Sequence, residues 1–292
     1  MIYDVRHLTT YGYSRPVPFA RCILRLLPRD DGGQRVRKSE LIITPRPAER
    51  IDGLCFFGNR MTTMTISKPH RELKVEMRAR IEVDRPAPPH PGLTRHWEEV
   101  GELALALTSL APDSPTHHLY PSRLVPFVAE VVDYARKSFS PLRPVLEAAS
   151  ELMARIRHDF EYDPDATEVS TPLAEAFRER HGVCQDFAHI MIAGLRGLGL
   201  PAAYVSGYIR TIPPPGQKRL AGADASHAWV MLWCGPETGW IGLDPTNDLI
   251  VADDHIVTAF GRDYADVSPL DGVLVGPGSQ KIGIAVDVIP VG

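Results

Sequence analysis

The sequence lacks the features that would indicate a membrane protein or a nucleic-acid-binding protein. No apolar run approaches the roughly 18 residues that a membrane-spanning helix needs, and the mean hydropathy is −0.12. Basic residues are not in excess, because 32 Lys and Arg stand against 36 Asp and Glu, for a net charge of −4. Nucleic-acid binders are usually strongly basic. We therefore expect neither a membrane nor a nucleic acid among the partners of this chain.

Cysteine is also scarce, and its spacing excludes the common metal and redox motifs. The four cysteines include no Cys-x-x-Cys pair, and they are Cys22, Cys55, Cys184 and Cys234. Residues 1–7 carry acidic and polar side chains where a signal peptide would need an apolar stretch. We expect a cytoplasmic protein with free thiols, no structural metal and no cofactor. Each thiol is then either a small packing residue or a reactive group.

The first third of the chain is predicted to form a β-sandwich. Strands are expected over residues 3–9, 20–27, 37–44, 60–67 and 72–83, which are separated by turn-forming clusters. The last of these alternates strictly between apolar and polar side chains, which is typical of a sheet with one wet face. We assign residues 1–90 to an antiparallel, sandwich-like N-terminal domain.

A proline-rich stretch over residues 85–91 marks the expected domain boundary, because proline removes a backbone donor and restricts the preceding residue. Residues 91–145 are predicted to form a helical connector, and residues 146–292 a catalytic core with a C-terminal strand. Helices are expected over 97–110, 124–139 and 144–160, and strands over 202–210, 227–234, 240–244 and 281–291. The fold class is therefore predicted to be α+β, and 292 residues at roughly 150 per domain indicate about two domains.

Cys184 is the cysteine whose surroundings favour reactivity. Gly182 precedes it closely, and apolar residues at helical spacing follow it, so Cys184 is predicted to lie at the start of a helix. The unpaired N–H groups and the dipole at a helix N-terminus stabilise a thiolate and can hold a developing oxyanion. A small buried residue at a helix start is the alternative interpretation.

Two later strands provide a base and a residue to orient it. A four-residue loop over 234–237 would pair residue 233 with residue 238 in an antiparallel hairpin, which would place His227 directly opposite Asp244. A thiol, an imidazole and a carboxylate in such an arrangement are the nucleophile, base and orienting group of acyl transfer. We therefore predict a catalytic triad of Cys184, His227 and Asp244.

The chain resembles the bacterial transglutaminase-like family, whose members are described as candidate cysteine proteases. The motifs of its core are matched at residues 182–189, 204–208, 226–229 and 243–246. Segments 7–11, 24–28, 57–59 and 68–70 are similar to the β-rich N-terminal region that accompanies this core, and 261–267 also resembles the family. The resemblance implies the same triad, on a papain-like core in which the cysteine helix packs on an antiparallel sheet.

Other residues near these motifs have weaker claims to a role. Gln185, Trp229 and Tyr208 are candidates for substrate or oxyanion contacts, although a solvated residue or a packing aromatic is the simpler interpretation of each. A metal site built from His181, Cys184, His227 and Asp244 is conceivable but has unusual ligand spacing. The proline-rich loop over 211–219 is a candidate for a mobile rim beside the site.

The expected function is hydrolysis of an amide or peptide bond through an acyl-enzyme. The substrate would be a peptide, a protein or a small amide, and a homo-oligomer remains open. Transamidation of protein glutamine is the first alternative, because this superfold also supports that reaction. The second is a non-catalytic binding or assembly module in which the triad is vestigial.

Overall fold

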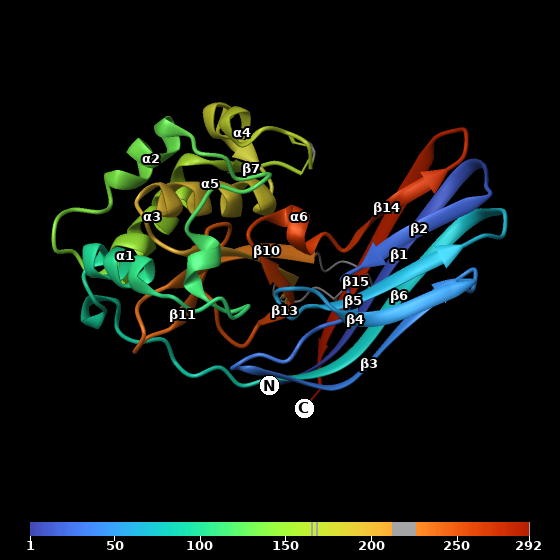
Figure 1. Ribbon diagram of the computed structural model, residues 1–292, viewed down its shortest axis with the longest axis horizontal. Helices are drawn as coiled ribbons and strands as arrows, with labels where there is room; N and C mark the ends of the chain where they lie inside the picture. Colours follow the sequence, from blue (N-terminus) through green and yellow to red (C-terminus); the bar gives the residue numbers. More distant parts are fainter. Residues whose placement is uncertain (165, 168, 212–225, 292) are drawn as a thin grey trace, which may run out of the picture.

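The computed structural model describes residues 1–164, 166–167, 169–211 and 226–291. A twisted β-sandwich stands beside a helical layer, and the sheet that carries β10 (Ser226–Trp233) and β13 (His255–Gly261) lies between them (Figure 1). Both ends of the chain lie close together at the base of the sandwich. The predicted α+β class is confirmed. The candidate rim over 211–219 lies, except for its first residue, outside the described residues.

The sandwich consists of two antiparallel four-stranded sheets, with strand orders β15-β1-β6-β3 and β14-β2-β5-β4. The N-terminal strands are β1 (Ile2–Val17), β2 (Phe19–Leu24), β3 (Gln34–Thr44), β4 (Glu49–Leu54), β5 (Arg60–Ile66) and β6 (His70–Val83). The alternation expected over 72–83 is confirmed in β6, where the apolar residues from Leu73 to Val83 are all buried. Their burial supplies much of the sandwich core, because apolar area removed from water is the main favourable contribution to folding.

The C-terminal strands complete this sandwich, which differs from the sequence-based division. We expected residues 146–292 to form one core, but β14 (Leu270–Val275) pairs with β2 and β15 (Gln280–Pro290) pairs with β1. Each strand adds an edge to one sheet of the sandwich. The periodicity of a strand shows which face is buried but not which partner it pairs with, so the sequence pattern could not reveal this pairing.

The core packs helices on one five-stranded antiparallel sheet of order β12-β11-β10-β9-β13. The strands are β9 (Ala202–Ile209), β10 (Ser226–Trp233), β11 (Trp240–Asp244), β12 (Leu249–Ile250) and β13 (His255–Gly261). The helices are α1 (Trp97–Ala106), α2 (Ala129–Arg136), α3 (Val145–Asp159), α4 (Leu173–Glu179), α5 (Cys184–Gly197) and α6 (Tyr264–Val267). Short elements connect them: 3-10 turns at Pro91–Leu93 and Pro115–His118, and paired strands β7 (Glu161–Tyr162) and β8 (His181–Gly182).

The two faces of the core sheet have different partners. Ala228, Val230 and Leu232 of β10 belong to the apolar cluster that contains the buried face of α5. Trp229 lies between Ala228 and Val230 in the sequence, and it packs with Val205 and Val257 in a separate small cluster. Successive residues of a strand point to opposite faces, so β10 contributes to both layers.

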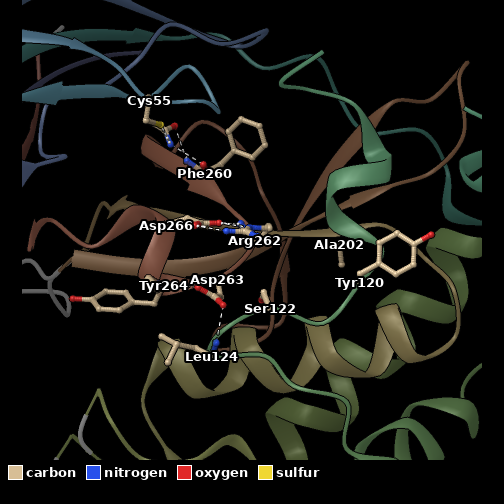
Figure 2. Close-up of polar contacts among 12 residues, drawn as sticks. Cys55, Tyr120, Ser122, Leu124, Ala202, Phe260, Arg262, Asp263, Tyr264 and Asp266 are labelled. Carbon is tan, nitrogen blue, oxygen red and sulfur yellow. Dashed lines mark hydrogen bonds and ion pairs between the residues drawn. The ribbon is translucent and has the colours of Figure 1, made fainter. Parts of the chain in front are cut away.

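Side-chain amides from the sandwich pair with the backbone of β13, the edge strand of the core sheet. The Gln34 side chain donates to the carbonyl of Val257 at 2.8 Å and accepts from its N–H at 2.8 Å. Asn59 makes the same pair of bonds with Phe260, at 2.8 and 3.0 Å. Figure 2 shows the dashed contacts at Phe260, beside Cys55. The sandwich therefore satisfies backbone groups that an edge strand would otherwise leave unpaired.

The turn after β13 is tied to the helical layer. Arg262 pairs with Asp266 at 2.8 Å, and Asp263 accepts a hydrogen bond from the backbone of Leu124 at 2.7 Å (Figure 2). Asp263 also accepts from the N–H of Ala265 at the start of α6. Both ends of the connection between β13 and α6 are thus fixed by charge-assisted hydrogen bonds.

Replacement of Gln34 by alanine is expected to lower the free energy of unfolding by about 2–4 kcal/mol, because it leaves two buried backbone groups of Val257 unpaired. Denaturant unfolding of the purified variant measures this change. The exposed Gln280 provides a matched control, and Gln280→Ala should shift stability by less than about 0.5 kcal/mol. Equal effects of the two substitutions would contradict this role of Gln34.

None of the helices in the described ranges is both long and apolar enough to cross a lipid bilayer.

Candidate functional site

Cys184 is the first residue of α5, as the sequence predicted, and it is half-buried. Asp186 secures this helix start: its Oδ2 accepts the N–H of Val183 at 2.9 Å and the hydroxyl of Thr167 at 2.6 Å. Burial raises the pKa of Asp186, against these hydrogen bonds. A Cβ atom at position 182 would lie 2.6 Å from Asp186 Oδ2. Glycine is therefore required there for the carboxylate to reach the backbone.

His227 and Asp244 form a buried pair beside this helix start. His227 Nε2 lies 2.7 Å from Asp244 Oδ2, and Asp244 has no exposed surface. Since an ionised carboxylate only accepts hydrogen bonds, the proton of this contact is on the imidazole. Cys184 lies close enough to the same imidazole that its side chain contributes to raising the pKa of His227. The structure thus brings together the three residues that the sequence analysis placed in a triad.

The hairpin that carries the pair differs from prediction by two residues. Trp233 pairs with Trp240 rather than with residue 238, so the connecting loop covers residues 234–239. Gly235 and Gly239 have φ angles of +100° and +70° in this loop, a region that favours glycine. A register shift of one residue between the two strands would have turned the Asp244 side chain to the opposite face of the sheet from His227. A shift of two residues keeps both side chains on the same face. His227 and Asp244 therefore meet diagonally instead of directly opposite each other.

Asp244 receives hydrogen bonds at both of its carboxylate oxygens. Oδ1 accepts from the backbone N–H groups of Thr246 and Asn247, at 3.0 and 3.2 Å. Oδ2 is shared by His227, the side-chain amide of Asn247 at 2.8 Å and His255 Nε2 at 3.1 Å. This density of donors compensates the carboxylate for its loss of water.

The electrostatics of the pair favour a charged imidazole. Burial lowers the pKa of His227, but the hydrogen bond to Asp244 and the nearby Cys184 side chain outweigh this effect, and the pKa rises to about 9. Burial also opposes ionisation of Asp244, yet the hydrogen bonds from His227 and His255 hold its pKa well below the usual range. The arrangement stabilises an imidazolium between a carboxylate and a thiol.

His255 and Asn247 are members of this site that the sequence analysis missed. His255 begins β13, a strand that was not expected, although the run from His255 to Phe260 is rich in β-branched and apolar residues. Asn247 lies in the turn after Asp244, a position where asparagine is common. The contact of His255 with Asp244 depends on sheet order, which no local pattern shows.

The three secondary candidates lie in different environments. Trp229 is fully buried, with its ring 6.1 Å from that of His227 and nearly parallel to it. It also lines a cavity of about 450 Å³ between the core sheet and the sandwich. Tyr208 is buried and its hydroxyl bonds His7 Nδ1 at 2.9 Å, so this geometry does not support a substrate contact. Gln185 is the second residue of α5, next to Cys184, and is buried.

The donor atoms of His227, Asp244 and His255 lie within 4.8 Å of one another, which is close enough for a metal ion. Their contacts of 2.7 and 3.1 Å are hydrogen-bond distances. Asn247 donates to the same carboxylate oxygen, so the group fits a hydrogen-bond network better than a metal centre. His181, considered above as a fourth ligand, is exposed.

Comparison with known protein families finds two matches along this chain. Residues 3–82 match the bacterial transglutaminase-like N-terminal region, and residues 132–245 match the transglutaminase-like superfamily. An uncharacterized protein of Mycobacterium tuberculosis is 40% identical over 99% of this chain and 92% of its own. A second, from Mycobacterium leprae, is 32% identical over 97% of each chain.

Two further matches have more specific names. A protein-glutamine gamma-glutamyltransferase of Pseudomonas aeruginosa is 33% identical over 120 residues, which are 38% of this chain and 18% of that protein. The crystal structure of "a Putative Cysteine Protease from Cytophaga hutchinsonii" superposes with a TM-score of 0.76 at 22% identity, over 100% of this chain and 92% of the other. This superposition shows a shared fold. The chain belongs to the bacterial transglutaminase-like family.

Proposed function

We propose that this protein cleaves an amide or peptide bond by thiol-dependent acyl transfer, with water as the final acceptor. The observation that carries the proposal is the buried 2.7 Å contact between His227 and Asp244, with the Cys184 side chain close enough to the same imidazole to raise the pKa of His227. Cys184 is the proposed nucleophile, His227 the acid and base, and Asp244 the residue that orients the imidazole.

The proposed reaction begins with the Cys184 thiolate forming a bond to the carbonyl carbon of the substrate. Helix geometry leaves the N–H groups of Cys184 and Gln185 without acceptors inside α5, and we propose that they stabilise the oxyanion. The imidazolium of His227 gives its proton to the leaving amine as the carbon–nitrogen bond breaks. Water then attacks the acyl-enzyme, His227 accepts its proton, and the thiolate leaves.

Selective alkylation of thiols tests the proposal without knowledge of the substrate. Iodoacetamide at neutral pH should modify Cys184 first, because its thiol is paired with a charged imidazole. Burial raises the pKa of Cys22 to about 11 and that of Cys234 to about 12, so both should react slowly. The half-buried Cys55 is the matched control. Peptide mass spectrometry that found Cys184 no faster than Cys55 would favour a non-catalytic module.

Transamidation is the competing reaction, and the match to the P. aeruginosa enzyme is the observation that favours it. It predicts incorporation of a fluorescent primary amine into a glutamine-containing protein. Hydrolysis predicts release of free acid without such incorporation. Measuring both products in one reaction, with Cys184→Ala as the blank, separates the two.

The rate of amide turnover is expected to fall as pH rises through about 9, because His227 then loses the proton that it gives to the leaving amine. The pKa of His227 is raised, so the protonated form predominates below this value. A pH–rate profile in single-turnover conditions measures the upper limb. A limb near the unperturbed histidine value of about 6.5 would contradict the proposed pairing.

A further inference from the structure

We propose that His255 is a positioning residue for the triad: its Nε2–H holds the carboxylate of Asp244 in the orientation that serves His227. This inference rests on the proposed function. The carboxylate of Asp244 is hydrogen-bonded to both histidines: its Oδ2 lies 2.7 Å from His227 Nε2 and 3.1 Å from His255 Nε2.

The hydrogen bonds of Asp244 explain why a second histidine matters. Its Oδ1 is held by two backbone N–H groups of the following turn. Its Oδ2 must accept from His227, and His255 and Asn247 provide the other donors at that oxygen. With both oxygens engaged, the carboxylate cannot rotate away from His227 without breaking bonds in a buried site, which is costly.

His255 is itself fixed independently of Asp244. Its ring packs edge-on against Trp229, at 5.2 Å and 74°, and its backbone pairs with Ile209 of β9. The edge of β13 two residues further on is covered by Gln34 of the sandwich. The N-terminal domain thereby supports the strand from which His255 reaches the site.

Few charged groups of the described residues surround His255. Asp244 faces it from β11 and His227 from β10, with ring centroids of the two histidines 6.2 Å apart. From the linker, the Arg85 guanidinium lies 3.5 Å from the carbonyl oxygen of His255. The neighbouring carboxylates are engaged elsewhere: Asp253 accepts the N–H of Arg85, and Asp254 accepts the hydroxyl of Tyr3 and pairs with Arg210. Among these charged groups, Asp244 is the one to which the His255 side chain is hydrogen-bonded.

The donor on His255 has a chemical consequence at Cys184. A carboxylate held in place stabilises the imidazolium of His227, and the imidazolium stabilises the thiolate. Without the His255 donor, one of the bonds that hold Asp244 Oδ2 toward His227 is lost. The carboxylate is then less firmly oriented, the imidazolium is less stable and less thiolate forms at neutral pH. The effect should therefore appear in the pH dependence of Cys184 reactivity.

The experiment compares His255→Phe with His255→Gln in the full chain. Phenylalanine retains a ring against Trp229 but has no donor, whereas glutamine retains an N–H donor. In His255→Phe, the midpoint of the pH profile for alkylation of Cys184 by iodoacetamide should move to higher pH by about one unit. At a pH below this midpoint, alkylation should be roughly tenfold slower than in the unmodified protein. In His255→Gln, the midpoint should remain within about 0.3 pH unit of that of the unmodified protein, which corresponds to a change in alkylation rate by a factor of about two.

A matched control separates positioning from loss of stability. His7 is also buried and bonds Tyr208 and Thr9, so His7→Phe should lower the melting temperature without moving the alkylation profile. A profile of His255→Phe that coincides with the unmodified protein would overturn the inference. A profile of His255→Gln that moves as far as that of the phenylalanine variant would overturn it too.

A measurement on the unmodified protein covers the case in which His255→Phe does not fold. The proposal requires the proton of His255 on Nε2, and ¹⁵N-resolved NMR of the imidazoles identifies the tautomer. Protonation on Nδ1 alone would refute the inference. The proposed function fails in a different way, namely if Cys184 of the unmodified protein reacts no faster than Cys55 at any pH.

Discussion

Cys184→Ala is expected to abolish amide turnover, with a loss of at least about 10³-fold, because no other described thiol lies at the His227 imidazole. Removal of a catalytic nucleophile leaves only the contributions of substrate binding and the oxyanion site. Turnover of a peptide or protein substrate, measured by release of free amine or ammonia, provides the readout.

The matched control is Cys55→Ala, because Cys55 is also half-buried and lies in the sandwich, beside Asn59. This substitution should leave turnover unchanged. Cys184 is not fully buried, so Cys184→Ala should keep a melting temperature close to that of the unmodified protein. Activity that survives in a folded Cys184→Ala variant would exclude the proposed mechanism.

Asp244→Asn is expected to have the second-largest effect, a loss of about 10³- to 10⁴-fold in turnover, by analogy with the orienting carboxylate of serine proteases. The asparagine presents an N–H group toward the Nε2–H of His227, so the imidazole loses both its orientation and the charge that raises its pKa. The upper limb of the pH–rate profile should accordingly move below pH 9.

Loss of stability is a separate consequence of the same substitution, since Asp244 is completely buried and accepts five hydrogen bonds. We expect a cost of about 3 kcal/mol in the free energy of unfolding. Asp263→Asn is the matched control, because Asp263 is also buried and holds backbone N–H groups of Leu124 and Ala265. Asp263→Asn should lower the free energy of unfolding but should not move the upper limb of the pH–rate profile. If Asp244→Asn lowers turnover no more than this control, Asp244 has no orienting role.

The approach of three remote residues illustrates what a sequence pattern can and cannot predict. The pattern at residues 182–198 predicts a helix that begins at Cys184, because glycine, cysteine and the apolar spacing are all local features. The hairpin of His227 and Asp244 was predicted with the right face but the wrong register. Loop length depends on turn conformation, and here two glycines with positive φ lengthen the turn.

Long-range strand pairing accounts for the larger differences. The strands at 270–275 and 280–290 could not be assigned to β2 and β1 from their own residues, because the backbone hydrogen bonds of a sheet are the same for any sequence. For the same reason, nothing in the sequence indicated that His255 of β13 would contact Asp244 of β11, across the width of the sheet.

The sequence by itself determined the α+β class, the alternation of β6, the four free cysteines and the choice of Cys184 among them. These properties depend on composition, local periodicity and the chemistry of a helix start. The tertiary structure alone decided which strands close the sandwich, how Gln34 and Asn59 cover β13, and that Asp244 serves two histidines. Those contacts join residues far apart in the chain. A buried polar group needs a hydrogen-bond partner, and the tertiary structure determines which partners lie near it.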